Sequence, residues 1–147
     1  MKYKLPVSVL IVVHTRERQV LLLERAQRPG YWQSVTGSLD WPDEALEAAA
    51  VREVREETGI DAAAGVLSRW NVANTFEIFR HWRHRFAPGV THNTEHVFGL
   101  ALRAPAAVTL AADEHVAFAW LPWREAAQKC FSWSNRDAVR MLGESAG

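Results

Sequence analysis

The stretch Arg52-Glu53-Val54-Arg55-Glu56-Glu57-Thr58-Gly59-Ile60 is the most informative segment of this chain. Residues three and four apart share one side of a helix, so a helix here brings Glu53, Glu56 and Glu57 together as one carboxylate patch. Like charges at this spacing repel each other, and acids near a helix C-terminus oppose the helix dipole. Pairing of Arg52 with Glu56 offsets part of that cost, and a divalent cation offsets more. The spacing alone leaves two interpretations open, a Mg²⁺ or Mn²⁺ site and a solvated charged face.

The residues around this stretch set the expected limits of its helix. Pro42-Asp43-Glu44 predicts the start, because proline fits a first turn and acids complement the positive end of the dipole. The Ala-rich sequence that follows has high helix propensity and runs through Glu57, and Gly59 suits the C-terminal stop. We therefore expect one helix that carries the whole carboxylate patch.

Short apolar runs elsewhere predict a sheet onto which this helix and two others pack. Polar residues 15–18 separate the first two runs, which is typical of two strands joined by a tight connection. Strands separated by a few helices favour a mixed sheet in an α/β arrangement. The expected strands span residues 7–13, 20–23, 31–39, 66–79, 94–102, 108–110 and 116–121, and the expected helices span residues 122–129 and 135–142, the last with Ser134 as its N-cap.

The composition is that of an ordinary globular domain, with 147 residues, 48% of them hydrophobic and 23% charged. Lys plus Arg and Asp plus Glu are both 17, so the net charge is zero, which argues against a broad surface for nucleic acid or an anionic membrane. The one cysteine, Cys130, fits a reducing compartment. No apolar run approaches the roughly 20 residues of a membrane helix, and no linker divides the chain. We expect a single domain over residues 1–147 of a cytoplasmic protein, with neither nucleic acid nor membrane as a partner.

Around the acidic stretch, the sequence resembles the signature of the Nudix hydrolase family, G-x5-E-x7-R-E-U-x-E-E-x-G-U, in which U is aliphatic. The match from Glu44 to Ile60 is complete, but six residues instead of five separate Gly37 from Glu44. This departure lengthens the loop before the helix without changing the register of the helix itself. The resemblance implies an α/β fold of the α+β kind, a Nudix-type α/β/α sandwich around a mixed β-sheet. It also implies hydrolysis of a nucleoside diphosphate linked to another group.

The resemblance assigns roles to six residues. Glu53, Glu56 and Glu57 match metal ligands, Arg52 the arginine that orients a glutamate, Gly37 the loop glycine whose carbonyl approaches the metal, and Glu114 a further acidic ligand or the general base. Breaking a phosphoanhydride requires its charge to be neutralised and a water to be deprotonated, and clustered Mg²⁺ ions do both. We therefore expect Mg²⁺ as the cofactor, with Mn²⁺ as a substitute. Which glutamate removes the proton stays open, and Glu114 has the alternative of an exposed loop acid.

Blocks outside the signature resemble one bacterial branch of the family, whose substrate is dihydroneopterin triphosphate, an intermediate of folate synthesis. These blocks are residues 31–38, 76–79, 83–91 and 132–136, and the resemblance covers nearly the full length. Basic side chains can neutralise phosphates, and a phenylalanine can cover a flat pterin ring. The implied substrate-binding residues are Lys4, Arg25, Thr36, Phe76, Glu77, Ile78, Phe79 and Ser132.

Some of these residues also have structural interpretations. Lys4 can be a solvated terminal lysine, Thr36 a strand hydroxyl and Ser132 a helix cap, while Phe76 and Phe79 can belong to the core. The basic residues 80–85 favour phosphate contact or subunit packing over nucleic acid in a neutral chain. These alternatives stay open at the level of the sequence.

The expected reaction is Mg²⁺-dependent hydrolysis of dihydroneopterin triphosphate to the monophosphate and pyrophosphate. One alternative is a pyrophosphohydrolase for dATP or a similar nucleoside triphosphate, which would share the metal helix but differ in its base pocket. Another is a sensing module that binds a nucleotide without turnover, against which the intact set of glutamates argues. The partner is a small-molecule triphosphate in each case, and either a monomer or a homodimer is compatible with the sequence.

Overall fold

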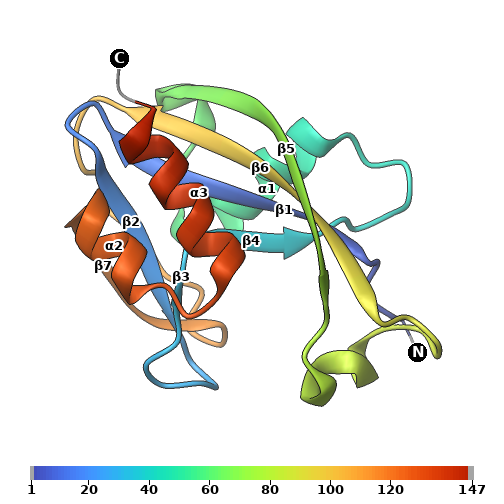
Figure 1. Ribbon diagram of the computed structural model, residues 1–147. Coiled ribbons are helices and arrows are strands. Elements are labelled where there is room, and N and C mark those ends of the chain that lie inside the picture. The colour runs from blue at the N-terminus through green and yellow to red at the C-terminus, as the bar shows by residue number, and fades with distance from the viewer. Residues whose placement is uncertain (1, 146–147) are drawn as a thin grey trace.

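The computed structural model describes residues 2–145, in which seven strands form one mixed sheet (Figure 1). The strand order is β3-β2-β1-β6-β5, with β4 paired to β1 and β7 paired to β2. Only β1 and β6 run parallel among these pairs. The strands are β1 (Val7–Thr15), β2 (Gln19–Arg25), β3 (Trp32–Gln33), β4 (Val35–Ser38), β5 (Val66–Glu77), β6 (His92–Leu102) and β7 (His115–Pro122). The α-helices are α1 (Leu46–Thr58), α2 (Trp123–Lys129) and α3 (Trp133–Glu144), and the 3-10 helices are η1 (Ala62–Ala64) and η2 (Arg80–Arg85).

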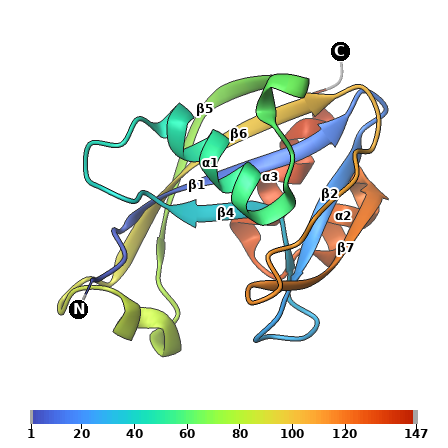
Figure 2. The same ribbon diagram turned by 180° about the vertical axis from the view of Figure 1, so that it is seen from behind.

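Helices cover both faces of the sheet. The two opposite views in Figures 1 and 2 show α1 on one face and α2 with α3 on the other. This arrangement confirms the expected α/β/α sandwich around a mixed sheet. Among the described helices, none has both the length and the apolar character needed to cross a membrane.

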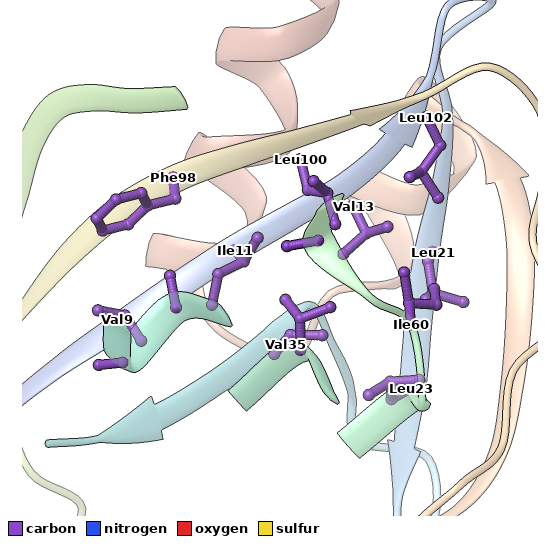
Figure 3. Close-up of a cluster of buried hydrophobic side chains, with 14 of the residues drawn as sticks. Val9, Ile11, Val13, Leu21, Leu23, Val35, Ile60, Phe98, Leu100 and Leu102 are labelled. Carbon is purple, nitrogen blue, oxygen red and sulfur yellow. The ribbon is translucent and has the colours of Figure 1, made fainter. Parts of the chain in front are cut away.

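The central strand β1 supplies side chains to both layers of the core. Val9, Ile11 and Val13 point to the face covered by α1, as Figure 3 shows, whereas Leu10 and Val12 pack in the cluster under α2 and α3. This alternation follows from the period of two in a strand. All five side chains are fully buried, and each such burial contributes roughly 1.5–3 kcal/mol to folding. The two clusters therefore fix both helical layers to the same strand.

The helix that carries the carboxylate patch begins later than expected. Leu46 is its first residue and Ala45 its N-cap, so the prediction that Pro42-Asp43-Glu44 opens it is wrong. Those residues belong to the preceding loop, because the Glu44 side chain turns inward to bond Arg52 instead of pointing outward from a first turn. The predicted stop is confirmed, since Gly59 adopts a left-handed φ of 73° and its N–H donates to the Arg55 carbonyl.

Three other element predictions also need correction. Residues 31–39 divide into β3 and β4, and residues 108–110 form no strand, because their backbone contact is a single bond from Thr109 N–H to the Thr58 carbonyl at the end of α1. The N-cap of α3 is Ser132, not Ser134, and Ser132 Oγ accepts a bond from Asn135 N–H. The basic residues after β5 form η2, a 3-10 helix that was not predicted from the sequence.

Candidate active site

The sheet divides beside β1, and this division positions the site. Residues 8–11 of β1 pair with β4, whereas His14 of β1 pairs with Val20 of β2. A cavity of about 1080 Å³ lies here, lined by residues of β4, α1, β5, β6 and the start of α3. All of the predicted site residues line it: Lys4, Arg25, Thr36, Gly37, Arg52, Glu53, Glu56, Glu57, Phe76, Glu77, Ile78, Phe79, Glu114 and Ser132.

Arg52 connects the helix to the loop before it. Its Nε donates to Glu44 at 2.9 Å, and its Nη1 donates to Glu53 at 2.7 Å and to Glu56 at 3.1 Å. Asp40 Oδ2 lies 3.2 Å from Arg52 Nε, and the Ser38 carbonyl accepts a further bond from Arg52 Nη2. The hydrogen bond to Glu44 is the largest influence that raises the pKa of Arg52 above its ordinary value. Arg52 therefore holds two glutamates of the patch in place while it anchors the loop.

The extra residue in the loop does not separate Glu44 from Arg52. The Glu44 side chain is 2% exposed, and its Oε1 also accepts a bond from Asp40 N–H at 2.8 Å. A second hydrogen bond, from Glu44 N–H to the Trp41 carbonyl, closes a turn within this longer loop. The longer loop thus folds back on itself and brings its glutamate to the position that the signature requires.

Glu44→Gln is expected to lower the melting temperature by roughly 2–12 °C at pH 7. Loss of a charged partner from a buried hydrogen-bonded group costs about 1–3 kcal/mol, and a domain of this size loses roughly 2–4 °C per kcal/mol. Hydrogen bonding to Arg52 lowers the pKa of Glu44 below its ordinary value of 4.5, so its stabilisation is complete above that pH and is lost as the pH falls.

Thermal melts of wild type and Glu44→Gln in EDTA at pH 7 and pH 3 measure this effect. The difference in melting temperature is expected to be largest at pH 7 and to shrink at pH 3. Glu47→Gln in the first turn of α1 is the matched control, because the Glu47–Arg69 ion pair is exposed and contributes little. Equal melting of wild type and Glu44→Gln at pH 7 would contradict the anchoring role.

Glu57 is the most deeply buried acid of the patch, with 3% of the residue exposed. Burial, followed by the proximity of Glu53 and Glu114, raises the pKa of Glu57 well above its ordinary value, although the Thr36 backbone N–H donates to it. Its Oε1 atom has no hydrogen-bond partner. His115 Nε2 lies 3.9 Å from that atom, but burial lowers the pKa of His115 to about 4, so the ring is neutral at pH 7. The negative charge of Glu57 therefore has no counter-charge from His115.

Gly37 lies on β4 at a position where a side chain would disturb this patch. A methyl group built on its Cα would overlap the carboxylate of Glu53. The absence of a Cβ thus lets the end of β4 approach α1 closely enough for the Gly37 backbone and the Glu53 carboxylate to meet. This contact explains in physical terms why the signature begins with glycine.

Glu114 brings a further carboxylate from the loop that precedes β7. Desolvation, together with the negative charges of Glu53, Asp113 and Glu56, raises the pKa of Glu114. Within residues 2–145, no three His, Cys, Asp or Glu side chains already converge as a formed metal site. The donor set nevertheless fits a hard divalent cation, because it consists of oxygen ligands that repel each other and includes the unpartnered Glu57 Oε1.

Basic side chains face this acidic patch across the cavity. Arg25 donates from Nη1 to Gln33 Oε1 at 3.3 Å and stacks over the Trp82 ring at 4.6 Å, while its buried Nε has no partner. Desolvation, Arg85 and Arg25 lower the pKa of Lys4, although the residue as a whole is exposed. Lys4, Arg25 and Arg85 are thus three cations that repel each other beside a patch of acids. This arrangement suits a ligand that carries several negative charges, which the cations bind directly and the acids bind through a divalent ion.

Aromatic side chains form the remaining wall. Phe79 is 47% exposed and packs edge-on against Trp82, with ring centroids 5.2 Å apart, and Phe131 lies 6.3 Å away. Phe76 meets the Trp133 ring edge-on at 6.3 Å. Neither phenylalanine belongs to the two buried core clusters, so the core interpretation of this pair is wrong.

The other predicted substrate residues have mixed surroundings. Glu77 forms an ion pair with Arg83 at 2.9 Å on the exposed side of β5, and Ile78 is buried just beyond that strand. Thr36 Oγ1 accepts a 3.4 Å bond from Gln33 Nε2. Ser132 is a helix cap, as its structural interpretation held, and also lines the cavity.

Several polar residues of the inner wall were not predicted as site residues from the sequence, chiefly Gln33, Asn93, Glu95 and Ser134. All four are buried. Asn93, Glu95 and buried Val97 lie at alternate positions on one face of β6. This spacing is visible in the sequence and could have identified the two polar residues. Polar residues at alternate positions of an otherwise apolar strand face mark an inward-facing polar surface.

Comparisons with known proteins agree with this geometry. Residues 4–142 match the NUDIX domain family. The chain is 47% identical to dihydroneopterin triphosphate diphosphatase of Escherichia coli K12 over 143 residues, which cover 95% of this chain and 93% of that protein. It is 36% identical to the protein of that name from Haemophilus influenzae, over 95% of this chain and 89% of that protein. The solved structure of the E. coli dihydroneopterin triphosphate pyrophosphohydrolase superposes with a TM-score of 0.91 and 44% identity, covering 99% of this chain and 100% of that one.

Proposed function

This chain belongs to the Nudix hydrolase family, and on that premise we propose that it hydrolyses dihydroneopterin triphosphate to dihydroneopterin monophosphate and pyrophosphate. The observation that carries the proposal is the 47% identity to an enzyme of that name over 95% of the chain. The cavity supports it, because acidic, basic and aromatic walls meet around a single space. A triphosphate attached to a flat ring has groups that suit each of these walls.

We propose Mg²⁺ as the divalent ion that this reaction uses, with Mn²⁺ as a substitute. When bound, such an ion neutralises phosphate charge and favours ionisation of a water molecule. Glu53 and Glu57 would hold it, with Glu56, Glu114 and the Gly37 carbonyl as further candidates. The unpartnered, buried Oε1 of Glu57 supports this assignment, because a bound cation would replace the missing interaction.

The chain's own residues supply the remaining steps. Lys4 and Arg25 would bind the phosphate oxygens and reduce the repulsion against an attacking water. Arg52 positions Glu53 and Glu56 through hydrogen bonds of 2.7 and 3.1 Å. Glu114 is suited to accept the proton of that water, because its raised pKa brings its basicity closer to neutral pH.

Substrate residues on β5 and α3 would hold the pterin end. The Phe76 ring and its neighbour Trp133 present flat apolar surfaces, and Phe79 closes the cavity nearer to Arg25 through its contact with Trp82. The backbone of residues 76–79 and the hydroxyl groups of Thr36 and Ser132 would add polar contacts. The ring and the phosphates would thus bind at different walls of the same cavity.

Pyrophosphate release from dihydroneopterin triphosphate and from dATP, measured side by side with Mg²⁺ and with EDTA, tests the proposal. We expect rapid release from the pterin substrate, a lower kcat/KM for dATP and loss of both activities in EDTA. A preference for dATP would contradict the proposed substrate while keeping the hydrolytic mechanism. Binding without turnover of either compound would instead support a sensing role.

We also propose a cytoplasmic, single-domain protein over residues 1–147 that acts as a monomer or a homodimer on a small-molecule triphosphate. The family match over residues 4–142 supports the domain limits. The free, buried thiol of Cys130 supports a reducing compartment, and burial raises its pKa to about 12. Light scattering during size-exclusion chromatography distinguishes the two oligomeric states.

A further inference from the structure

The inner wall of the cavity holds a buried carboxylate that the proposed mechanism does not use. Glu95 lies on β6, opposite Ser8 of β1 in the parallel pairing, and 4% of the residue is exposed. It lies on the face of the sheet that α3 covers, whereas Glu53 projects from α1 on the other face. Glu95 is therefore separate from the carboxylate patch although both border the same cavity.

Two acceptor atoms on this wall have no donor. Glu95 Oε1 is buried without a hydrogen-bond partner, and so is Asn93 Oδ1. The Asn93 side chain is oriented by its other atom, because Nδ2 donates to Ser8 Oγ at 2.8 Å and leaves Oδ1 available. Buried acceptors without a partner are unfavourable in a folded protein, so a ligand that supplies donors at this wall gains affinity from them.

The electrostatics of Glu95 are consistent with an unfilled acceptor site. Burial raises its pKa to about 7, and a hydrogen bond from the Ser134 side chain acts in the opposite direction. Further N–H donors from a ligand would stabilise the ionised carboxylate in the same way. The site thus favours a ligand edge that offers donors and disfavours one that offers acceptors.

The shape beside this wall selects a flat ligand. Phe76 lies opposite Asn93 in the antiparallel pairing of β5 with β6, and Trp133 at the start of α3 contacts Phe76 edge-on. A planar ring between these groups would present its edge to the two unpartnered acceptors. A pterin has a 2-amino group beside N3–H, so this edge carries two adjacent donors that match the two oxygens of a carboxylate.

On the basis of the proposed function, we propose that Glu95 is a specificity-determining residue that accepts hydrogen bonds from the 2-amino group and N3–H of the pterin ring, with Asn93 Oδ1 as the neighbouring acceptor. The Watson–Crick edge of adenine presents one donor and one acceptor, so it cannot satisfy a carboxylate in this bidentate way. Glu95 would therefore discriminate the pterin from adenine nucleotides. The hydrolytic residues at the other end of the cavity would act on both.

Binding of two ring compounds to the wild-type chain in EDTA provides the first test. Pterin has an amino group at C2, whereas lumazine has a carbonyl there and is otherwise the same ring system. We expect pterin to bind at least about tenfold more tightly in a calorimetric titration, because the lumazine carbonyl faces the carboxylate without a donor. Equal affinity for the two compounds would overturn the proposal.

Glu95→Gln provides the second test, because it keeps the side-chain size and adds a donor. We expect the variant to lose about tenfold or more in pterin affinity, to reduce the preference over lumazine and to raise KM for dihydroneopterin triphosphate more than it changes kcat. The kcat/KM for dATP is expected to change less than about twofold. Glu125→Gln, an exposed position on α2 outside the cavity, is the matched control.

The two proposals can fail separately. A wild-type chain that prefers pterin to lumazine without hydrolysing the pterin triphosphate contradicts the proposed reaction and supports the Glu95 contact. A chain that hydrolyses the pterin triphosphate, with Glu95→Gln folded and unchanged in both binding and KM, contradicts the Glu95 contact alone. Thermal melts establish whether Glu95→Gln is folded. If it is not, the comparison of pterin and lumazine binding to the wild-type chain tests the Glu95 contact by itself.

Discussion

Glu57→Gln is expected to lose at least about 10³-fold in pyrophosphate release while its metal-free form melts at a higher temperature than wild type at pH 8. Glutamine keeps the shape of the side chain but removes the charge that a divalent ligand site requires. The same charge is unfavourable without the cation, because the carboxylate is buried and lies beside Glu53 and Glu114. Activity and metal-free stability therefore change in opposite directions.

The pH dependence of this stability gain follows from the raised pKa of Glu57. An acid whose folded-state pKa is raised has no effect on stability while it is protonated in both states, and it destabilises the fold once the unfolded state ionises. Wild type therefore loses stability as the pH rises above the ordinary value of 4.5 toward the folded-state value, whereas the glutamine variant does not. The difference in melting temperature is expected to be absent near pH 4 and fully developed at high pH.

Pyrophosphate assays with Mg²⁺ and thermal melts in EDTA at pH 4 and pH 8 measure both effects. Glu125→Gln on the surface of α2 serves as the matched control and is expected to resemble wild type in each assay. Addition of Mg²⁺ is expected to raise the melting temperature of wild type more than that of Glu57→Gln, because a ligand that binds the native state stabilises it. Full activity in the variant would contradict the ligand assignment.

Gly37→Ala is expected to lose about 10²-fold or more in kcat with a smaller effect on folding. The new methyl group would overlap the Glu53 carboxylate, which must then move away from β4 and from its bond with Arg52. That carboxylate is the end of a flexible side chain, so the fold tolerates its displacement better than the reaction does. We therefore expect a folded protein in which the Glu53 carboxylate, a proposed metal ligand, is displaced.

Gly30→Ala separates this effect from a general cost of replacing glycine. Gly30 has a φ of 86°, so alanine there strains the backbone, but nothing lies within 4 Å of the position of its new Cβ. Gly30→Ala is therefore expected to lower the melting temperature and keep the kcat of wild type, the reverse of Gly37→Ala. Steady-state kinetics and thermal melts of both variants compare the two, and an unchanged kcat in Gly37→Ala would refute the close-contact argument.

The helical repeat explains why part of the site was predictable from the sequence. The positions of Glu53, Glu56 and Glu57 on one patch, and the pairing of Arg52 with Glu56, depend only on spacing along α1. The continuous apolar run of β1 likewise predicted a buried strand. These features are local, so neighbouring residues in the chain determine them.

Other features depend on contacts between distant segments. Glu44 left the predicted first turn of α1 because it bonds Arg52, and residues 108–110 formed no strand although their composition favoured one. The unpartnered state of Glu95 depends on β1, β5 and α3, which together bury it and leave Oε1 without a donor. The periodicity of the sequence does not predict these contacts between distant segments.

The division of the sheet beside β1 has an evolutionary consequence. The hydrolytic glutamates Glu53, Glu56 and Glu57 lie on α1, beside Gly37 of β4, whereas β6 carries Asn93 and Glu95 on separate backbone. Substitutions at positions 93 and 95 therefore change the ring that is selected with little disturbance of the hydrolytic groups, and mutational effects from the two halves are expected to be close to additive. In a library randomised at positions 93, 95 and 76, we expect variants that accept triphosphates of other heterocycles while the hydrolytic residues stay unchanged.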